Sequence, residues 1–262
     1  MPRPRLGHIQ FINCLPLYYG MVKNDVLLDV DLVRANPADL AGMLVDGELD
    51  IAPIPAIEYA RNADDLVLLP ETFTSGFSND AIAQAETMDG PTVVWIREQA
   101  CALGAAICGS VQLRDGEDVF NRLLFATPDG ELRTYDKRHL FRFGREHERY
   151  AAGRDRLVVD WCGWRICPLV CYDLRFPVWS RNPPAAPYDL LLYVANWPAV
   201  RRTAWTTLLR ARAIENVACA LGVNRIGQDG LGHDYAGDSA LIDARGNYLV
   251  EAGAQPGIFT HT

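Results

Sequence analysis

The stretch "ICPLVCYDLRFP", residues 166–177, decides the fold class more than any other part of the sequence. An apolar run typical of a buried strand ends at Cys171, and an acid, an arginine and a proline follow directly behind it. In layered α/β folds, side chains at the ends of strands converge on one crevice. Cys171 is therefore either a small buried hydrophobe or a nucleophile at such a crevice, and the rest of the chain has to distinguish the two.

Two other predicted strands are each followed by a charged residue. "LVLLPETF" places Glu71 immediately after a predicted strand over residues 65–70. "NRLLFATPDGELRTYDK" predicts a hairpin that turns at residues 128–130, and Lys137 follows its second strand. Three strand ends thus offer a carboxylate, an ammonium group and a thiol.

Around these strand ends, the hydrophobic period alternates between that of strands and that of helices. Apolar stripes predict one helix that Thr92 caps and Gly104 ends, and another over residues 203–218. Because hairpins and crossover connections occur together, the pattern favours a layered α/β fold over a purely parallel sheet.

The composition excludes several classes of protein. Apolar residues make up 49% of the 262 residues and charged residues 22%, as in soluble globular enzymes. The net charge of −8 disfavours nucleic acid or an anionic membrane as a partner, and no run approaches the roughly 18 apolar residues of a membrane span. Seven cysteines without a C-x-x-C motif and five dispersed histidines predict no metal site, and we expect reduced thiols in a cytoplasmic protein.

A carboxylate, an ammonium group and a thiol at one crevice have a coherent chemical use. A cysteine thiol with its ordinary pKa of about 8.5 is mostly protonated at neutral pH, so a nucleophilic cysteine needs a base or a nearby cation. Glu71 is the candidate base for the proton of Cys171. Lys137 and the backbone N–H of Tyr172 are the candidate donors to the oxyanion that forms when the sulfur attacks a carbonyl.

Three motifs in this order carry a resemblance to a known family. "LLPETFTSGF", "YDKRHLFRF" and "VCYDLRFPVW" resemble the Glu, Lys and Cys motifs of the nitrilase (carbon–nitrogen hydrolase) superfamily, most closely its ω-amidase branch. The resemblance extends over residues 65–258 and implies an αββα sandwich that pairs into a homodimer. It also implies Glu71 as base, Lys137 as oxyanion support and Cys171 as nucleophile. The implied reaction is hydrolysis of a small carboxylate-bearing amide, such as 2-oxoglutaramate, to acid and ammonia through a cysteine thioester, without a cofactor.

Two other roles have alternatives in the sequence. The superfamily often has a second glutamate between its lysine and its cysteine; Glu146 fits that place best, and Glu148 is the alternative. Arg175 either grips a substrate carboxylate or pairs with Asp173 or another acid. We therefore name Arg175 and Tyr172 as candidate substrate-binding residues.

Other prominent side chains have structural explanations. Arg212 and Glu215 lie three residues apart on a predicted helix, where a structural ion pair is the better explanation. The six cysteines other than Cys171 are expected to fill the core, because free cysteine is often buried.

The N-terminal part of the chain does not fit this resemblance. Residues 5–70 resemble the N-terminal part of chorismate dehydratase from the futalosine route to menaquinone, which implies Asn13 as the counterpart of a catalytic asparagine. We therefore divide the chain into a chorismate-dehydratase-like segment, residues 1–64, which replaces the first β-α-β segment of the hydrolase, and a carbon–nitrogen hydrolase domain, residues 65–262. Two alternative functions stay open, a chorismate dehydratase-like lyase and an inactive hybrid.

Overall fold

The computed structural model describes residues 5–8, 31–35, 40, 43, 48, 66–77, 82–83, 85–257 and 259. By its internal contacts the chain divides into two units, Met1–Asp64 and Asp65–Thr262, and each is described by itself. In the first unit, β1 (Arg5–His8) pairs in parallel with β2 (Asp31–Arg34). Most predictions for this unit, Asn13 among them, lie outside the described residues.

The first sheet of the second unit delivers Glu71 and Lys137. Its strand order is β3-β4-β5-β6, with β3 (Leu66–Leu68), β4 (Ala106–Asp115), β5 (Asp118–Ala126) and β6 (Leu132–Asp136). β3 pairs with β4 in parallel, and the other neighbours are antiparallel. The predicted turn joins β5 to β6, and Gly130 takes its positive φ of 86° there. The hairpin register opposes Arg122 to Asp136, so Asn121 lies beside Lys137, whose N–H donates to the Asn121 oxygen at 3.0 Å.

The second sheet delivers Cys171. Its strand order is β14-β13-β10-β9-β8-β7, with β7 (Val159–Trp161), β8 (Trp164–Val170), β9 (Leu190–Ala195), β10 (Cys219–Asn224), β13 (Ala240–Ile242) and β14 (Tyr248–Glu251). The central strands β8, β9 and β10 are parallel, and all of β9 is buried, as continuous apolar strands covered on both faces should be. A separate hairpin of β11 (Ile226–Gln228) and β12 (Asp234–Ala236), which the sequence analysis did not predict, lies between β10 and β13 in the chain.

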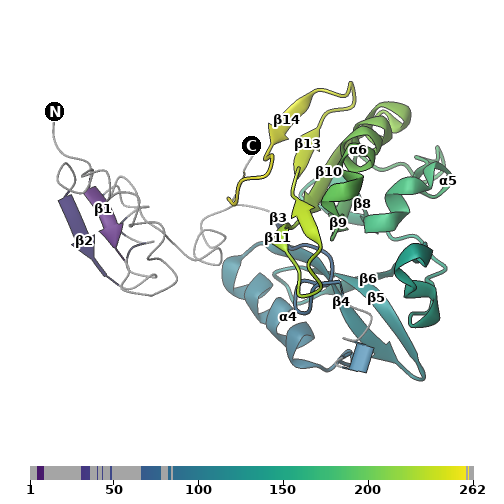
Figure 1. Ribbon diagram of the computed structural model, residues 1–262, viewed down its shortest axis with the longest axis horizontal. Helices are drawn as coiled ribbons and strands as arrows, with labels where there is room; N and C mark the ends of the chain where they lie inside the picture. Colours follow the sequence, from purple (N-terminus) through teal and green to yellow (C-terminus); the bar gives the residue numbers. More distant parts are fainter. Residues whose placement is uncertain are drawn as a thin grey trace. The chain divides into compact units, whose positions relative to one another are not determined.

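Helices cover the outer faces of the two sheets. Helix α4 (Pro91–Leu103) contacts β4 and β5, and α6 (Arg202–Asn216) contacts β10 and β13, with α5 (Pro177–Ser180) beside it. Figure 1 shows α4 on one side of the unit and α5 and α6 on the other. Because β5 also contacts β8, the sheets face each other, and the layers are helix, sheet, sheet, helix. The predicted αββα sandwich is confirmed.

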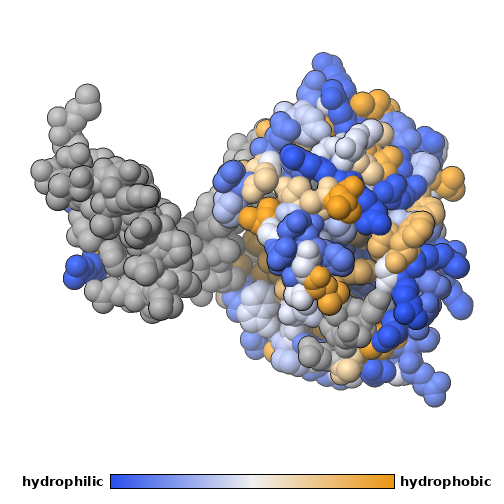
Figure 2. Space-filling view, viewed as in Figure 1, coloured by the Kyte–Doolittle hydropathy of each residue, from blue (hydrophilic) through white to orange (hydrophobic). Residues whose placement is uncertain are grey.

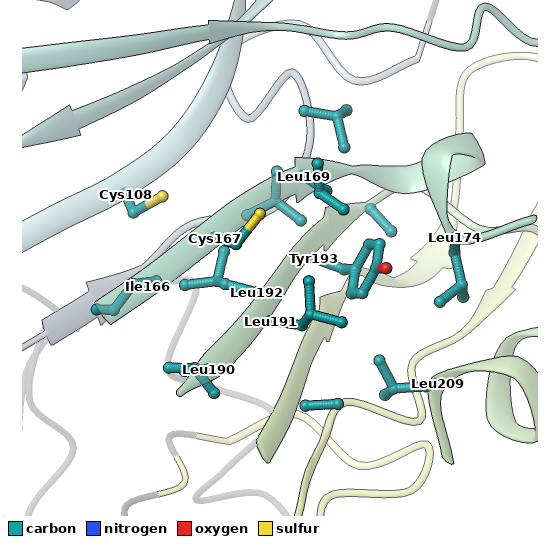
Figure 3. Close-up of a cluster of buried hydrophobic side chains, with 14 of the residues drawn as sticks. Cys108, Ile166, Cys167, Leu169, Leu174, Leu190, Leu191, Leu192, Tyr193 and Leu209 are labelled. Atoms are coloured by element: carbon teal, nitrogen blue, oxygen red, sulfur yellow. The ribbon is translucent and has the colours of Figure 1, made fainter. Parts of the chain in front are cut away.

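The core lies between the sheets and beneath α6. Cys108 of β4 and Cys167 and Leu169 of β8 contribute to one buried cluster, which continues to Tyr193 of β9 and Leu209 of α6 (Figure 3). Each fully buried side chain of this size contributes about 1.5–3 kcal/mol of hydrophobic free energy. The packing of one sheet on the other therefore fixes the relative positions of the strand ends that carry the candidate residues.

The predictions for three individual residues are wrong. Thr92 does not cap α4, because the helix begins at Pro91 after Gly90, and the Thr92 hydroxyl instead donates to Glu86 at 2.5 Å. The Glu86 carboxylate also accepts from the Thr92 N–H at 2.8 Å. A residue outside the helix thus supplies the acceptor for a backbone N–H of the first turn, which has no acceptor within the helix. Cys101 and Cys162 are exposed rather than buried, because Cys101 lies on the outward face of α4 and Cys162 lies in the turn between β7 and β8.

Some apolar side chains stay on the surface of the second unit. Figure 2 shows apolar residues scattered among hydrophilic ones on one face. Val178 of α5 is 88% exposed, and Val217, directly after α6, is 78% exposed. Within the described residues, each helix is too short or too polar to cross a membrane.

Candidate active site

The candidate residues leave different strands and meet where these strands end. Glu71 follows β3, Lys137 follows β6, and Cys171 follows β8. Glu146 lies on the short 3-10 helix η5 (Glu146–Glu148), in the loop after Lys137. The structure brings these four side chains together, as predicted for the three that follow strands.

Lys137 lies at the centre of the group. Its Nζ donates to Glu71 Oε1 at 2.8 Å and to Glu146 Oε1 at 2.9 Å, and its side chain has no exposed surface. Burial acts to lower the pKa of Lys137, but the charges of Glu146 and Glu71 outweigh it, so the pKa is raised well above its ordinary value. Lys137 is therefore a buried, charged ammonium group and not a solvated residue at the end of a hairpin.

Glu71 is held from both sheets. Asn121 Nδ2, from β5, donates to Glu71 Oε1 at 2.8 Å, and the backbone N–H of Asn196, after β9, donates to Oε2 at 2.8 Å. Asn196 Nδ2 also donates to the backbone oxygen of Glu71 at 2.8 Å. The next residue, Thr72, has a φ of 40°, in the left-handed region that side chains disfavour. The N–H of Thr72 donates to Ser110 Oγ at 2.9 Å and secures this sharp turn.

Glu146, and not Glu148, lies beside Lys137. Glu146 is fully buried, and its Oε2 accepts a hydrogen bond of 2.6 Å from the backbone N–H of Phe141. Burial raises the pKa of Glu146; Lys137 opposes this, and the charge of Glu71 adds to it. Glu148 is exposed to solvent and pairs with Arg145 at 2.7 Å.

A glycine closes the loop that carries Glu146. The N–H of Gly153 donates to the backbone oxygen of Lys137 at 3.0 Å, so the loop returns to its starting point. A Cβ at Gly153 would lie 2.0 Å from the backbone oxygen of Asp136, which no side chain can tolerate. We conclude that only glycine allows this close approach.

Cys171 occupies a sharp turn between β8 and the 3-10 helix η6 (Cys171–Arg175). Its φ of 43° lies in the left-handed region, which costs free energy for any residue with a Cβ. Asp173, fully buried, holds the turn: it accepts from the Val170 N–H at 3.1 Å, the His139 N–H at 2.9 Å and the Tyr135 hydroxyl at 2.7 Å. The strained position of the thiol is thus imposed by its surroundings.

The surroundings of Cys171 favour its thiol form over the thiolate. Its pKa is raised well above the ordinary value, first by burial and then by the charge of Glu71, with Lys137 opposing. A hydrogen bond to the Glu71 side chain adds to the increase. The arrangement therefore supplies a neutral thiol together with a carboxylate placed to take its proton.

A pocket opens in front of this group. Lys137, Cys171 and Asn196 contribute to its lining, and its other side chains are mainly aromatic rings and guanidinium groups. The Tyr172 ring packs edge-on against Phe141, with ring centroids 5.0 Å apart. Both candidate substrate-binding residues, Tyr172 and Arg175, line the pocket.

The structure decides between the alternatives for the nearby arginines. Arg175 does not pair with Asp173, because other donors occupy that carboxylate; its guanidinium lies 5.0 Å from the centroid of the Trp197 ring. The ion pair of Arg212 and Glu215 is confirmed at 2.8 Å. Within the described ranges, no three histidine, cysteine, aspartate or glutamate side chains gather as a metal site would require.

Comparison with known proteins places this site in a family. A family model described as carbon-nitrogen hydrolase matches residues 39–262. The chain belongs to the carbon–nitrogen hydrolase family. It is similar to the omega-amidase YafV of Yersinia enterocolitica, with 51% identity over 193 residues, 74% of this chain and 73% of the relative. It is also similar to the 2-oxoglutaramate amidase of Bacillus subtilis strain 168, with 34% identity over 205 residues, 77% of this chain and 79% of the relative.

A solved carbon–nitrogen hydrolase has the same fold. XC1258 from Xanthomonas campestris, described as a CN-hydrolase superfamily protein with an arsenic adduct in its active site, has a TM-score of 0.74 and 59% identity. The match covers 84% of this chain and 82% of that chain. The superfamily predicted from the three motifs is confirmed. The range matched by the family model begins at residue 39, inside the segment that the sequence analysis assigned to another family.

Sequence reasoning missed three polar residues of this carbon–nitrogen hydrolase site. Asn121 and Asn196 hold Glu71, and Arg201 lines the pocket beside Arg175. A usable signal existed for Asn121, because a hairpin centred on residue 129 places it opposite Lys137. Neither Asn196 nor Arg201 has such a signal, since Asn196 acts on Glu71 and Arg201 packs against Phe141, and both partners are distant in the sequence.

Proposed function

We propose that this carbon–nitrogen hydrolase is an ω-amidase that converts a small carboxylate-bearing amide, such as 2-oxoglutaramate, to the acid and ammonia. The observation that carries the proposal is the Lys137 ammonium group, bound by Glu71 and Glu146 at 2.8 and 2.9 Å beside a cysteine that opens to a pocket. Similarity to an omega-amidase and to a 2-oxoglutaramate amidase supports this choice of substrate.

In the proposed acylation step, Cys171 attacks the amide carbon while its proton passes to Glu71. The new S–C bond leaves an oxyanion, which Lys137 Nζ and the backbone N–H of Tyr172 stabilise. The amide nitrogen takes the proton from Glu71, the C–N bond breaks, and ammonia leaves. The product of this half-reaction is a thioester on Cys171.

In the proposed deacylation step, water attacks the thioester carbon and gives its proton to Glu71. The C–S bond then breaks, the acid is released, and the proton returns to the sulfur. We assign Glu146 the role of fixing Lys137, because its buried carboxylate accepts a hydrogen bond from the ammonium group in addition to the one that Glu71 accepts. Arg175 and Tyr172 are assigned to substrate binding, since they line the pocket in front of Cys171.

Ammonia release from 2-oxoglutaramate tests this function. We expect ammonia and 2-oxoglutarate in equal amounts, and an acyl-enzyme mass on Cys171 when the reaction is quenched early. The same preparation is given chorismate, the substrate of the alternative lyase. Dehydration of chorismate without ammonia release would replace the amidase assignment by the lyase, and turnover of neither compound would favour the inactive hybrid.

We keep as a proposal that residues 1–64 are a chorismate-dehydratase-like segment and residues 65–262 the hydrolase domain. The contact division between Asp64 and Asp65 supports this boundary. A cytoplasmic location is also proposed, since the free thiols suit a reducing compartment. These free thiols include Cys101, Cys108, Cys167, Cys171 and Cys219.

We further propose that the enzyme is a homodimer. Val178, Ile214 and Val217 are 88%, 49% and 78% exposed at the neighbouring helices α5 and α6, and a second copy of this chain would bury them. Sedimentation equilibrium should give twice the chain mass of 29.1 kDa, and Ile214→Glu should shift the protein toward the monomer. A single-chain mass for the unaltered protein at all concentrations would contradict the proposal.

A further inference from the structure

Two guanidinium groups line the pocket without a carboxylate partner. Arg175 lies on η6 behind the nucleophile, and Arg201 ends the 3-10 helix η7 (Ala199–Arg201) after β9. Among the residues that the structure describes, neither guanidinium forms an ion pair or a side-chain hydrogen bond. Both are half-buried, so each has given up part of its hydration without gaining a counter-charge.

Arg201 is held in place by its backbone. Trp197 Nε1 donates to the Arg201 oxygen at 2.8 Å, and the Arg201 N–H donates to the Pro198 oxygen at 2.9 Å. Trp197 is itself secured by a bond of 2.8 Å from its N–H to Asn224 Oδ1. The turn that aims Arg201 is therefore fixed from β9 and β10, the same sheet that presents Cys171.

Aromatic rings support both guanidinium groups. Arg201 lies 5.2 Å from the centroid of the Phe141 ring, and Arg175 lies 5.0 Å from that of Trp197. A ring face attracts a guanidinium group and leaves its N–H donors free at the edges. Both groups can therefore still donate hydrogen bonds to an anion.

The neighbouring arginine, Arg202, has the carboxylate partner that Arg201 lacks. Arg202 donates to both oxygens of Asp238, at 2.6 and 2.8 Å. It differs from Arg201 by one position in the chain, yet it has its own carboxylate. The lack of a partner is therefore a property of the pocket and not of this stretch of chain.

The charges around the pocket leave one positive charge unmatched. Three cationic side chains line the pocket, those of Lys137, Arg175 and Arg201, and the carboxylates of Glu71 and Glu146 both pair with Lys137. A substrate with one negative charge brings the site to neutrality, whereas a neutral amide leaves the surplus in place. The electrostatics thus favour a monoanion.

We infer that Arg201 is a second anion-binding residue, which shares the single carboxylate of the substrate with Arg175 and so makes the pocket selective for monoanionic amides. A carboxylate has enough lone pairs to accept from two guanidinium groups at once. The inference rests on the proposed amidase function and adds to it a residue that determines specificity. Neutral amides of the same length are the substrates that the pocket discriminates against.

Two amides of matched length test this inference. Succinamate carries a carboxylate at the end opposite its amide, and butanamide has a methyl group in its place. In Arg201→Met, the kcat/KM ratio of succinamate to butanamide should fall at least about 10-fold, mainly through KM, as the loss of a charge-assisted hydrogen bond requires. Arg202→Gln is the matched control and should keep the ratio of the unaltered enzyme.

Alkylation gives a readout that does not depend on amide turnover. Iodoacetate is anionic and iodoacetamide is neutral, so the ratio of their rates at Cys171 reports anion binding in the pocket. Exposed Cys101 provides the internal reference for intrinsic reactivity, and peptide mass spectrometry separates the two sites. Arg201→Met should lower the iodoacetate to iodoacetamide ratio at Cys171 and leave it unchanged at Cys101.

The outcomes separate this inference from the proposed function. If no amide is turned over, the function fails, but the alkylation ratio still decides whether the pocket binds anions. If amides are turned over and Arg201→Met changes neither ratio, the anion site is overturned. It is also overturned if Arg202→Gln changes both ratios as much as Arg201→Met does. Arg201→Lys covers the case in which the Met variant does not fold, and it should lower both ratios less, because it keeps the charge but not the forked geometry.

Discussion

Cys171→Ala should abolish amide hydrolysis, with a loss of at least roughly 10⁴-fold in kcat, the scale seen when a nucleophile is removed. The fold should persist, because alanine meets the same left-handed φ of 43° that cysteine does and adds no new strain. Asp173 and its donors hold the turn whichever side chain occupies the position. Ammonia release and a thermal unfolding curve measure the two effects separately.

Substrate protection supplies the control for this first prediction. Iodoacetamide alone is a poor discriminator, because Cys101 is exposed and Cys171 is a buried thiol with a raised pKa. Succinamate should slow the alkylation of Cys171 and leave that of Cys101 unchanged. Hydrolysis that survives in Cys171→Ala, or equal protection of both thiols, would remove Cys171 as the nucleophile.

Lys137→Met should reduce kcat at least about 100-fold, as the loss of an oxyanion donor commonly does. It should also destabilise the protein by about 3–5 kcal/mol at neutral pH, the cost of breaking a buried ion pair. The reason is that Glu71 and Glu146 are both fully buried and would face each other without the ammonium group between them. Chemical denaturation and steady-state kinetics measure these two losses.

The deficit in stability should depend on pH in a definite direction. Burial and the charge of Glu71 already raise the pKa of Glu146, and removing Lys137 takes away the charge that opposes them. A carboxyl group whose folded pKa lies above its unfolded value contributes stability at low pH and loses it as pH rises through the folded pKa. The destabilisation of Lys137→Met should therefore shrink as the solution is acidified.

A double variant separates the structural and catalytic parts of this effect. Adding Glu146→Gln to Lys137→Met removes one buried negative charge, so the stability at neutral pH should partly return. Turnover should stay low, because the donor to the oxyanion is still missing. Near-normal turnover in Lys137→Met would mean that the lysine only balances charge.

Glu71→Gln provides the corresponding test of the base. It should lower kcat by a similar factor of at least about 100.

Much of the site could be predicted because its residues follow strands that are recognisable in the sequence. Glu71 and Cys171 each come just after an apolar run, and the hairpin turn at Gly130 fixes the register that leads to Lys137. The ends of strands on packed sheets converge on one crevice, so the positions of the predicted strands already limit where these side chains lie. The ion pair of Arg212 and Glu215 was predictable for the same local reason.

The remaining parts of the site depend on contacts that no local pattern records. Asn196 reaches Glu71 from 125 residues away in the sequence, and Arg201 meets the ring of Phe141 from a different part of the chain. Glu86 replaces the expected cap of α4 because it approaches the helix start from a neighbouring loop. The hairpin of β11 and β12 escaped prediction because its strands have three residues each, too few to establish a period.

Because of the hydrogen bonds of Glu71, catalytic activity depends on the packing of the two sheets against each other. Glu71 leaves a strand of three residues, while its carboxylate and backbone are bound by Asn196 of the opposite sheet. In a partly unfolded state that keeps its secondary structure but loosens its interior, Glu71 and Cys171 would separate although every strand stayed paired. The enzyme should therefore lose its catalytic activity early in denaturation, before far-ultraviolet circular dichroism records any loss of secondary structure.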